Sequence, residues 1–109
     1  MSYKVLTIPP FDKQIKRLVK KYPSLKVEIA NLIRDLKTTP GQGIALGNDC
    51  YKIRLAVASK GKGKSGGARV ITYLAIAGSS IFLLSIYDKS QQSDIEDKEL
   101  LRLLDLAKL

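Results

Sequence analysis

The strongest constraint on the fold is a change in the spacing of apolar residues along the chain. Residues 51–58 alternate between apolar and polar side chains, and residues 68–77 and 80–89 are two further apolar runs of strand length. Alternation with a period of two is typical of a β-strand. We therefore expect three consecutive antiparallel strands, with a tight hairpin turn at Gly78 and Ser79 between the last two.

The segments on either side of these strands show helical spacing. Apolar residues recur every three or four positions from 11 to 22, and again from 25 to 37, with Pro23 between the two stretches. This pattern predicts two helices in an antiparallel hairpin. Residues 3–8 are expected to form a short strand before the hairpin, and residues 38–49 a loop rich in glycine and polar residues.

A last helix is expected near the C-terminus. Residues 93–96 match a capping-box pattern, and the apolar positions that follow fall on one helical face. The expected order is therefore β-α-α-β-β-β-α. This order predicts an α+β fold, with a small antiparallel sheet packed against the helical hairpin and the C-terminal helix, as a single domain over residues 1–109.

The positive charge of the chain is concentrated in its middle. The formal net charge is +9, and residues 50–87 contain six lysines and arginines but no acidic residue. Strand alternation places most of these cations on one face of the sheet together with tyrosines, in the set Lys52, Arg54, Arg69, Tyr73, Tyr87 and Lys89. The loop that joins two of the strands adds Lys60, Lys62 and Lys64. Cations beside tyrosine rings suit RNA, because the cations bind phosphates and the rings stack on bases. The alternative is a solvated polar face whose two tyrosines are incidental.

Several classes of enzyme are disfavoured by residues that the sequence lacks. It contains no histidine and a single cysteine, Cys50, which excludes histidine-dependent triads and thiolate zinc clusters. The GKS triplet at 63–65 resembles part of a phosphate-binding loop, but its first glycine would fall at Ala58 and a strand follows it. Cys50 is interpreted as a packing residue. With no disulfide framework, no membrane-spanning apolar run and no signal-peptide pattern, we expect a cytoplasmic protein.

A phosphodiester reaction driven by cations remains possible. RNA carries its own nucleophile, the 2′-hydroxyl, so the protein must only orient it, stabilise charge on the phosphoryl oxygens and move protons. Arginine presents a fork of donors that stays charged, a lysine crowded by cations can act as a base, and tyrosine can act as an acid. Such a reaction requires no metal and no cofactor.

Three elements taken together resemble the RelE/ParE superfamily of bacterial toxins, and within it the HigB-like branch. They are KIR at 52–54, GKGKSGGAR at 61–69 and IYDK at 86–89. The resemblance implies a RelE-like fold and the toxin of a type II toxin–antitoxin pair. It also implies a ribosome-dependent endoribonuclease, an mRNA interferase that cuts translated mRNA in the ribosomal A site through 2′-hydroxyl attack.

The resemblance also implies roles for individual residues. Arg69 matches an arginine that holds the scissile phosphate, with Arg54 and Lys89 at further basic catalytic positions. RelE carries a functional tyrosine near the start of its last segment, where this chain has Ile95, and Tyr87 is our candidate for the equivalent role. Lys52, Lys60, Lys62, Lys64 and Tyr73 would bind RNA. The implied partners are mRNA, the 70S ribosome with its rRNA, and a cognate antitoxin, with no membrane involved.

Two other functions fit the same fold. A ParE-like protein would inhibit DNA gyrase without catalysing a reaction, although such a protein has no evident need for arginines and a lysine-rich loop on one face. A module that binds RNA or ribosomes without cutting is the other alternative.

Overall fold

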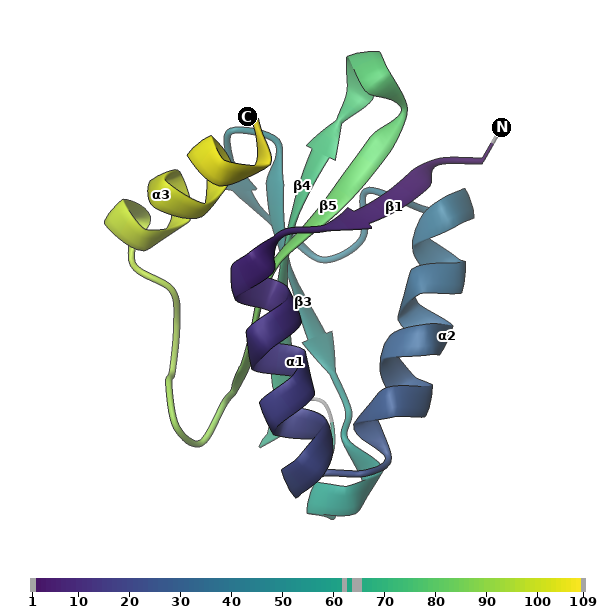
Figure 1. Cartoon of the computed structure of the whole chain (residues 1–109), viewed down its shortest axis with the longest axis vertical. Coiled ribbons are helices and arrows are strands. Elements are labelled where there is room, and N and C mark those ends of the chain that lie inside the picture. Colours follow the sequence, from purple (N-terminus) through teal and green to yellow (C-terminus); the bar gives the residue numbers. More distant parts are fainter. Residues whose placement is uncertain (1, 62, 64–65, 109) are drawn as a thin grey trace.

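The computed structural model describes residues 2–61, 63 and 66–108. Five strands in this part of the chain form one sheet in the order β1-β5-β4-β3-β2 (Figure 1). Their bounds are Lys4–Thr7 for β1, Ile44–Gly47 for β2, Cys50–Leu55 for β3, Ala68–Ala75 for β4 and Ser80–Asp88 for β5. The three antiparallel strands expected between residues 51 and 89 are confirmed as β3, β4 and β5.

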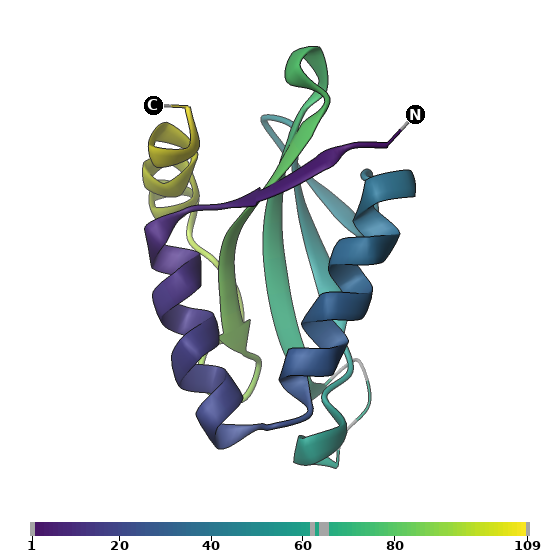
Figure 2. The ribbon, with the colours of Figure 1, turned by 45° about the vertical axis from the view of Figure 1, so that its right-hand side comes forward.

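Helices cover both faces of this sheet. Helix α1 spans Pro9–Lys21 and α2 spans Leu25–Thr38, and the two lie side by side along the strands as the expected hairpin (Figure 2). Helix α3, Asp97–Ala107, lies toward the other face. Lys108, directly after α3, holds its ammonium nitrogen 5.7 Å from the ring of Tyr73, which alternation places on the face opposite the hairpin. None of the described helices is long and apolar enough to cross a bilayer.

Two expectations about the sheet were wrong. Strand β1 pairs in parallel with β5, so the sheet is mixed and not wholly antiparallel. The segment 38–49 contains the edge strand β2, which turns back into β3 through Asn48 and Asp49 at φ values of 55° and 60°. Left-handed conformations at both central residues are what a two-residue hairpin turn requires, and Asn and Asp tolerate them. The polar turn residues had made this whole segment resemble a loop.

The expected turn and cap also differ in detail. A short 3-10 turn at Ile76–Gly78 precedes Ser79, so the connection between β4 and β5 is longer than a two-residue hairpin turn. Helix α3 has Glu96 as its N-cap residue, with no side-chain capping bond. The carboxylate of Asp94 instead accepts a hydrogen bond from the backbone N–H of Ile95 at 2.8 Å.

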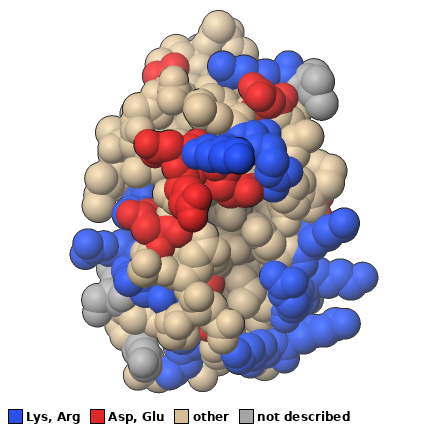
Figure 3. All heavy atoms as spheres, turned by 90° about the vertical axis from the view of Figure 1, so that its left-hand side faces the viewer, with Lys and Arg blue, Asp and Glu red and all other residues tan. Residues whose placement is uncertain are grey.

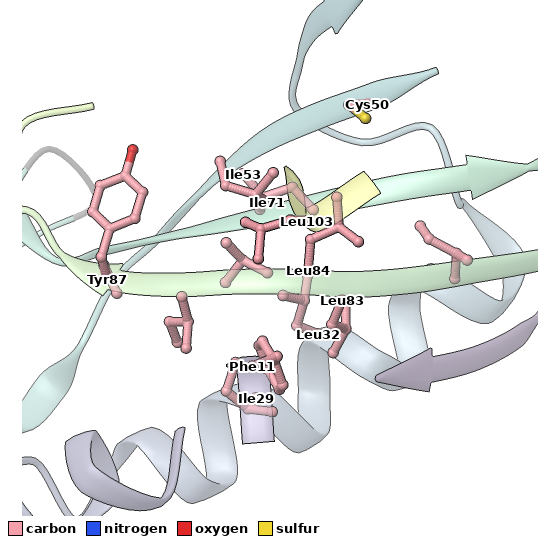
Figure 4. Packing of buried hydrophobic residues seen from close by; sticks show 14 of the residues in the cluster. Phe11, Ile29, Leu32, Cys50, Ile53, Ile71, Leu83, Leu84, Tyr87 and Leu103 are labelled. Atoms are coloured by element: carbon pink, nitrogen blue, oxygen red, sulfur yellow. The ribbon is translucent and has the colours of Figure 1, made fainter. Parts of the chain in front are cut away.

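The apolar core lies where the strands meet the helices. Leucines from both sides of the sheet are almost completely buried in this core: Leu25 and Leu36 of α2, Leu83 and Leu84 of β5, and Leu103 of α3. Figure 4 shows part of this cluster, with Tyr87 at its edge. Leucines from helices on both sides therefore hold the central strands in place, and the half of the sheet near the start of β4 carries the polar residues described next.

Candidate functional site

Three of the expected site residues form a row across three strands. Arg54 of β3 pairs with Arg69 of β4, and Arg69 pairs with Tyr87 of β5. Directly opposed residues on neighbouring strands project from the same face of a sheet, about 5 Å apart. The sheet register therefore places two arginines and a tyrosine next to one another on the face opposite the helical hairpin.

The members of this row differ in exposure. Arg54 is exposed, whereas Arg69 is 4% and Tyr87 is 6% exposed. One guanidinium nitrogen of Arg69, Nη1, donates to the carbonyl of Ala68 at 3.2 Å. The hydroxyl of Tyr87 is buried and has no hydrogen-bond partner within the described part of the chain. A buried polar atom without a partner is unusual in a native protein and calls for a functional explanation.

The environment of Tyr87 keeps its hydroxyl protonated. Burial raises the pKa of Tyr87, the nearby carboxylate of Asp94 raises it further, and the positive charge of Arg69 acts in the opposite direction. The net effect is a pKa above the ordinary value for tyrosine. At neutral pH this group can donate a hydrogen bond or a proton, and it does not act as a base.

Two expected lysines lie beside the row. Lys52, two residues before Arg54 on the same face, forms an ion pair with Asp94 at 3.2 Å. The hydrogen bond from the backbone N–H of Ile95, followed by this contact with Lys52, lowers the pKa of Asp94. Lys89 directly follows β5, is half-buried, and donates its backbone N–H to the carbonyl of Gly67 at 3.0 Å. Both ammonium groups therefore belong to the same end of the sheet as the row.

Tyr73 does not join this group. It lies four residues beyond Arg69 on β4, a separation of about 13 Å along a strand. Its ring stacks on Phe82 with a centroid separation of 5.9 Å and lies under the ammonium group of Lys108. The structure thus places Tyr73 in the contact between the sheet and the end of α3, and not beside the arginines.

Lys60 also occupies a different place from the one expected. Its ammonium group forms a buried ion pair with Asp88, and the two side chains are 6% and 2% exposed. The Lys60 ammonium group also donates to the carbonyl of Gly67 at 3.4 Å. This bond joins the two ends of the loop between Lys60 and Gly67, which connects β3 to β4. Lys60 is thus about as enclosed as Arg69, and its expected contact with RNA stays a prediction. Lys62 and Lys64 lie outside the described residues.

Asp88 is a residue whose importance sequence reasoning missed. Besides Lys60, it accepts hydrogen bonds from the hydroxyls of Tyr22 at 2.8 Å and Ser90 at 2.7 Å. Burial opposes ionisation, but the bonds from Lys60, Ser90 and Tyr22 outweigh it and hold the pKa of Asp88 well below its usual range. A signal was present in the sequence, because alternation places this acid on the apolar, helix-facing side of β5, where a charge needs a partner.

The base of the loop is closely packed around this ion pair. A Cβ atom at Gly67 would lie 2.1 Å from the carbonyl oxygen of Leu55, so only glycine fits there. The backbone N–H of Ala58 donates to the carboxylate of Glu28 at 2.7 Å, and that of Ser59 donates to the Ser24 hydroxyl at 2.9 Å. Both ends of the segment are therefore fixed to the body of the molecule.

The remaining candidates for chemistry are few. Cys50 is buried, and burial raises the pKa of its thiol to about 11, which agrees with a packing role. No group of three or more side chains suited to a metal ion lies together in the described part of the chain. The expectation of a reaction without metal or cofactor stays a prediction.

The architecture is that of a known class of small α+β protein, as comparison with solved structures shows. The fold is similar to that of the E. coli toxin RelE, solved as an arginine mutant in the free state, with a TM-score of 0.62 and 15% identity over 96% of this chain and 97% of that one. The same toxin bound to a peptide of the antitoxin RelB is also similar, with a TM-score of 0.52 and 18% identity over 94% and 93% of the two chains.

The family model described as the RelE toxin of the RelE/RelB toxin–antitoxin system matches residues 11–109. The chain belongs to the RelE toxin family.

Proposed function

We propose that this toxin cuts messenger RNA in the ribosomal A site, by attack of the RNA's own 2′-hydroxyl and without a metal, as a HigB-like member of the family. The observation that carries the proposal is the row of Arg54, Arg69 and Tyr87 on one sheet face. Two guanidinium groups side by side match the charge of a phosphodiester in its transition state, and a protonated phenol lies next to them.

In this mechanism the bond from the 2′-oxygen to phosphorus forms while the bond from phosphorus to the 5′-oxygen breaks. Arg69 and Arg54 stabilise the charge on the non-bridging oxygens, with Lys89 as a further cation at the end of β5. Tyr87 donates a proton to the departing 5′-oxygen, and the proton of the 2′-hydroxyl passes to water. The raised pKa of Tyr87 supports the role of a proton donor.

The partners follow from the same surface. Arg69 and Tyr87 are almost fully buried in the free protein, so binding of RNA must displace the groups that cover them. Asp94, which pairs with Lys52, belongs to those surroundings. Ribosomal RNA and mRNA would supply the phosphates for the exposed cations. A cognate antitoxin would restrain the toxin in the cytoplasm, as the complex of the E. coli relative with a RelB peptide suggests.

The test is primer extension on a reporter mRNA incubated with purified protein, with and without translating ribosomes. We expect cuts in register with the reading frame only when ribosomes are present. Arg69→Ala should abolish the cuts, while Lys26→Ala, an exposed cation on α2, should leave them unchanged.

An absence of cuts in both samples would contradict the proposal. If expression of the same protein still arrested growth, a supercoiling assay would then test inhibition of gyrase. Ribosome binding without cutting or growth arrest would instead identify a non-catalytic binding module.

A further inference from the structure

Helix α1 presents a continuous row of positive charge to solvent. Its members, all exposed, recur at the spacing that places side chains on one side of a helix: Lys13, Lys16, Arg17, Lys20 and Lys21. Within the described residues none of these five forms an ion pair. Like charges three and four positions apart repel one another, so this arrangement weakens the helix unless anions neutralise it.

A hollow lies beside this row of cations and is bordered by one residue of the candidate site. It lies between α1 and the end of β5, has a volume of about 320 Å³, and is lined by Arg17 and Lys21 from α1 and by Tyr87 from β5. The amide side chains of Gln14, Gln91 and Gln92 line it as well. Leu18, Ile86 and Asp88 complete the lining, so the hollow is mixed in character, with its two cations on the α1 side and Tyr87 of the candidate site on the β5 side.

On the side of the candidate site away from α1, the segment that leads into α3 carries several acidic residues. Asp94, Glu96, Asp97 and Glu99 follow one another in the segment that leads into α3. Figure 3 shows acidic side chains gathered at the centre of this face, with a group of cations over α1 to their right and another at the lower left. Lys52 and Arg102 partly neutralise Asp94 and Glu99, whereas the cations of α1 form no ion pair within the described residues, so a phosphate chain that leaves the site is attracted toward α1.

We propose that the exposed face of α1 and the adjoining hollow form a track for the phosphate backbone of the single-stranded RNA that continues from the cleavage site. The row from Lys13 to Lys21 covers nine residues, or about 12 Å of helix between the first and the last, which is enough for a few nucleotides. The glutamine amides in the hollow can donate to phosphate or to base edges. This inference rests on the proposed function, because the proposed cleavage site is where the RNA track would begin.

The test measures binding of 2′-O-methyl RNA, which lacks the attacking hydroxyl and cannot be cut by the proposed reaction. A trinucleotide and an oligonucleotide of about 12 residues are compared by fluorescence anisotropy over a range of salt concentrations. The variant Lys16→Gln/Arg17→Gln/Lys20→Gln should lose affinity for the long oligonucleotide and keep it for the trinucleotide. Its salt slope should fall by about 2, because single strands contribute roughly 0.7 per neutralised phosphate.

A control variant separates a local track from net charge. Lys4→Gln/Lys26→Gln/Lys37→Gln removes the same charge from exposed positions outside α1, and it should bind both oligonucleotides like the wild type. Equal losses in the two variants, or equal losses for the two oligonucleotides, would overturn the inference. Unchanged oligonucleotide binding with weakened ribosome binding would overturn it in favour of ribosomal RNA as the occupant of α1.

This binding assay does not depend on catalysis. If the protein binds the long oligonucleotide through α1 but never cuts mRNA, the track is supported and the proposed nuclease activity is contradicted. If the wild type cuts mRNA but the α1 variant binds the long oligonucleotide normally, the nuclease activity is supported and the track is contradicted.

Discussion

Near the start of β4, each face of the sheet has a buried cation: Lys60 on the side of the helical hairpin and Arg69 on the opposite side. The two places differ in how completely the polar groups around the cation are hydrogen-bonded. On the hairpin side, Asp88 accepts from Lys60, Tyr22 and Ser90. On the other side, the row that contains Arg69 includes the hydroxyl of Tyr87, which lacks a partner among the described residues.

These two sites are adjacent in the sheet. Ala68 pairs with Asp88, and Arg69 pairs with Tyr87, so consecutive cross-strand pairs point to opposite faces. A saturated network fixes the strand ends and the base of the loop, whereas an unsaturated one retains the capacity to bind a ligand. Burial of a cation therefore does not by itself mark the functional face. Beside the buried cation, the unpaired hydroxyl of Tyr87 distinguishes it; the other such hydroxyl among the described residues, that of Thr72, lies further along β4.

The largest expected effect is the loss of stability when the ion pair on the hairpin side is broken. Lys60→Met should lower the free energy of unfolding by about 3–5 kcal/mol, because it leaves the Asp88 carboxylate buried without its cation. Urea unfolding measures this change. The double variant Lys60→Met/Asp88→Asn should recover part of the loss, since it removes the uncompensated charge. A single variant as stable as the wild type would show that the pair carries no structural weight.

Two tyrosines test the contrast directly. Tyr87→Phe should reduce mRNA cleavage about 10²- to 10⁴-fold, the usual contribution of a general acid, and leave stability unchanged because its hydroxyl has no partner to lose among the described residues. Tyr22→Phe should behave in the opposite way. It loses a bond to a buried carboxylate, about 1.5–3 kcal/mol, and keeps both its ring contact with Lys60 and normal cleavage.

Each tyrosine variant serves as the control for the other, with primer extension and urea unfolding as the two measurements. If both variants lose activity in proportion to stability, the two faces do not have separate roles.

Acid should weaken the hairpin-side network selectively. The pKa of Asp88 is depressed in the folded protein, so its contribution is fully present above the unfolded pKa of about 3.9 and is lost as pH falls through the folded value. The difference in unfolding free energy between the wild type and Asp88→Asn should therefore be constant above about pH 5 and shrink below about pH 4. Urea unfolding across this range measures it, and a difference that widens in acid would contradict the assignment.

The spacing of apolar residues was sufficient to predict most of the fold. Periods of two and of three to four identified the helical hairpin and strands β3, β4 and β5, because each period reflects one buried face. The edge strand β2 was missed because it is short, with Ile44 exposed, and lies among turn residues. The parallel pairing of β1 could not be predicted, since pairing between distant strands depends on packing of the whole chain.

The same alternation placed Arg54, Arg69 and Tyr87 on one face but could not distinguish free from enclosed cations. Lys60 lies in a glycine-rich segment that resembles a solvent-exposed loop, and its partner Asp88 is 28 residues away. Tyr73 shares the face of Arg69, yet it contributes to the α3 contact because it lies at the other end of β4. Alternation identifies the face of a residue, and only the tertiary structure identifies its neighbours.

The smallest expected effect concerns Asp94, the acid near the row of Arg54, Arg69 and Tyr87. Asp94→Asn should tighten binding of RNA a few-fold, because it removes a negative charge near Tyr87 and frees Lys52 for phosphate. Asp94 is 62% exposed, so stability should change by less than about 1 kcal/mol, and asparagine can still accept from the N–H of Ile95. Asp105→Asn, at an exposed position on α3, makes the same change in net charge and should leave binding unaltered. Equal tightening in the two variants would mean that net charge alone governs RNA binding, and that the acid paired with Lys52 does not restrict access to the row.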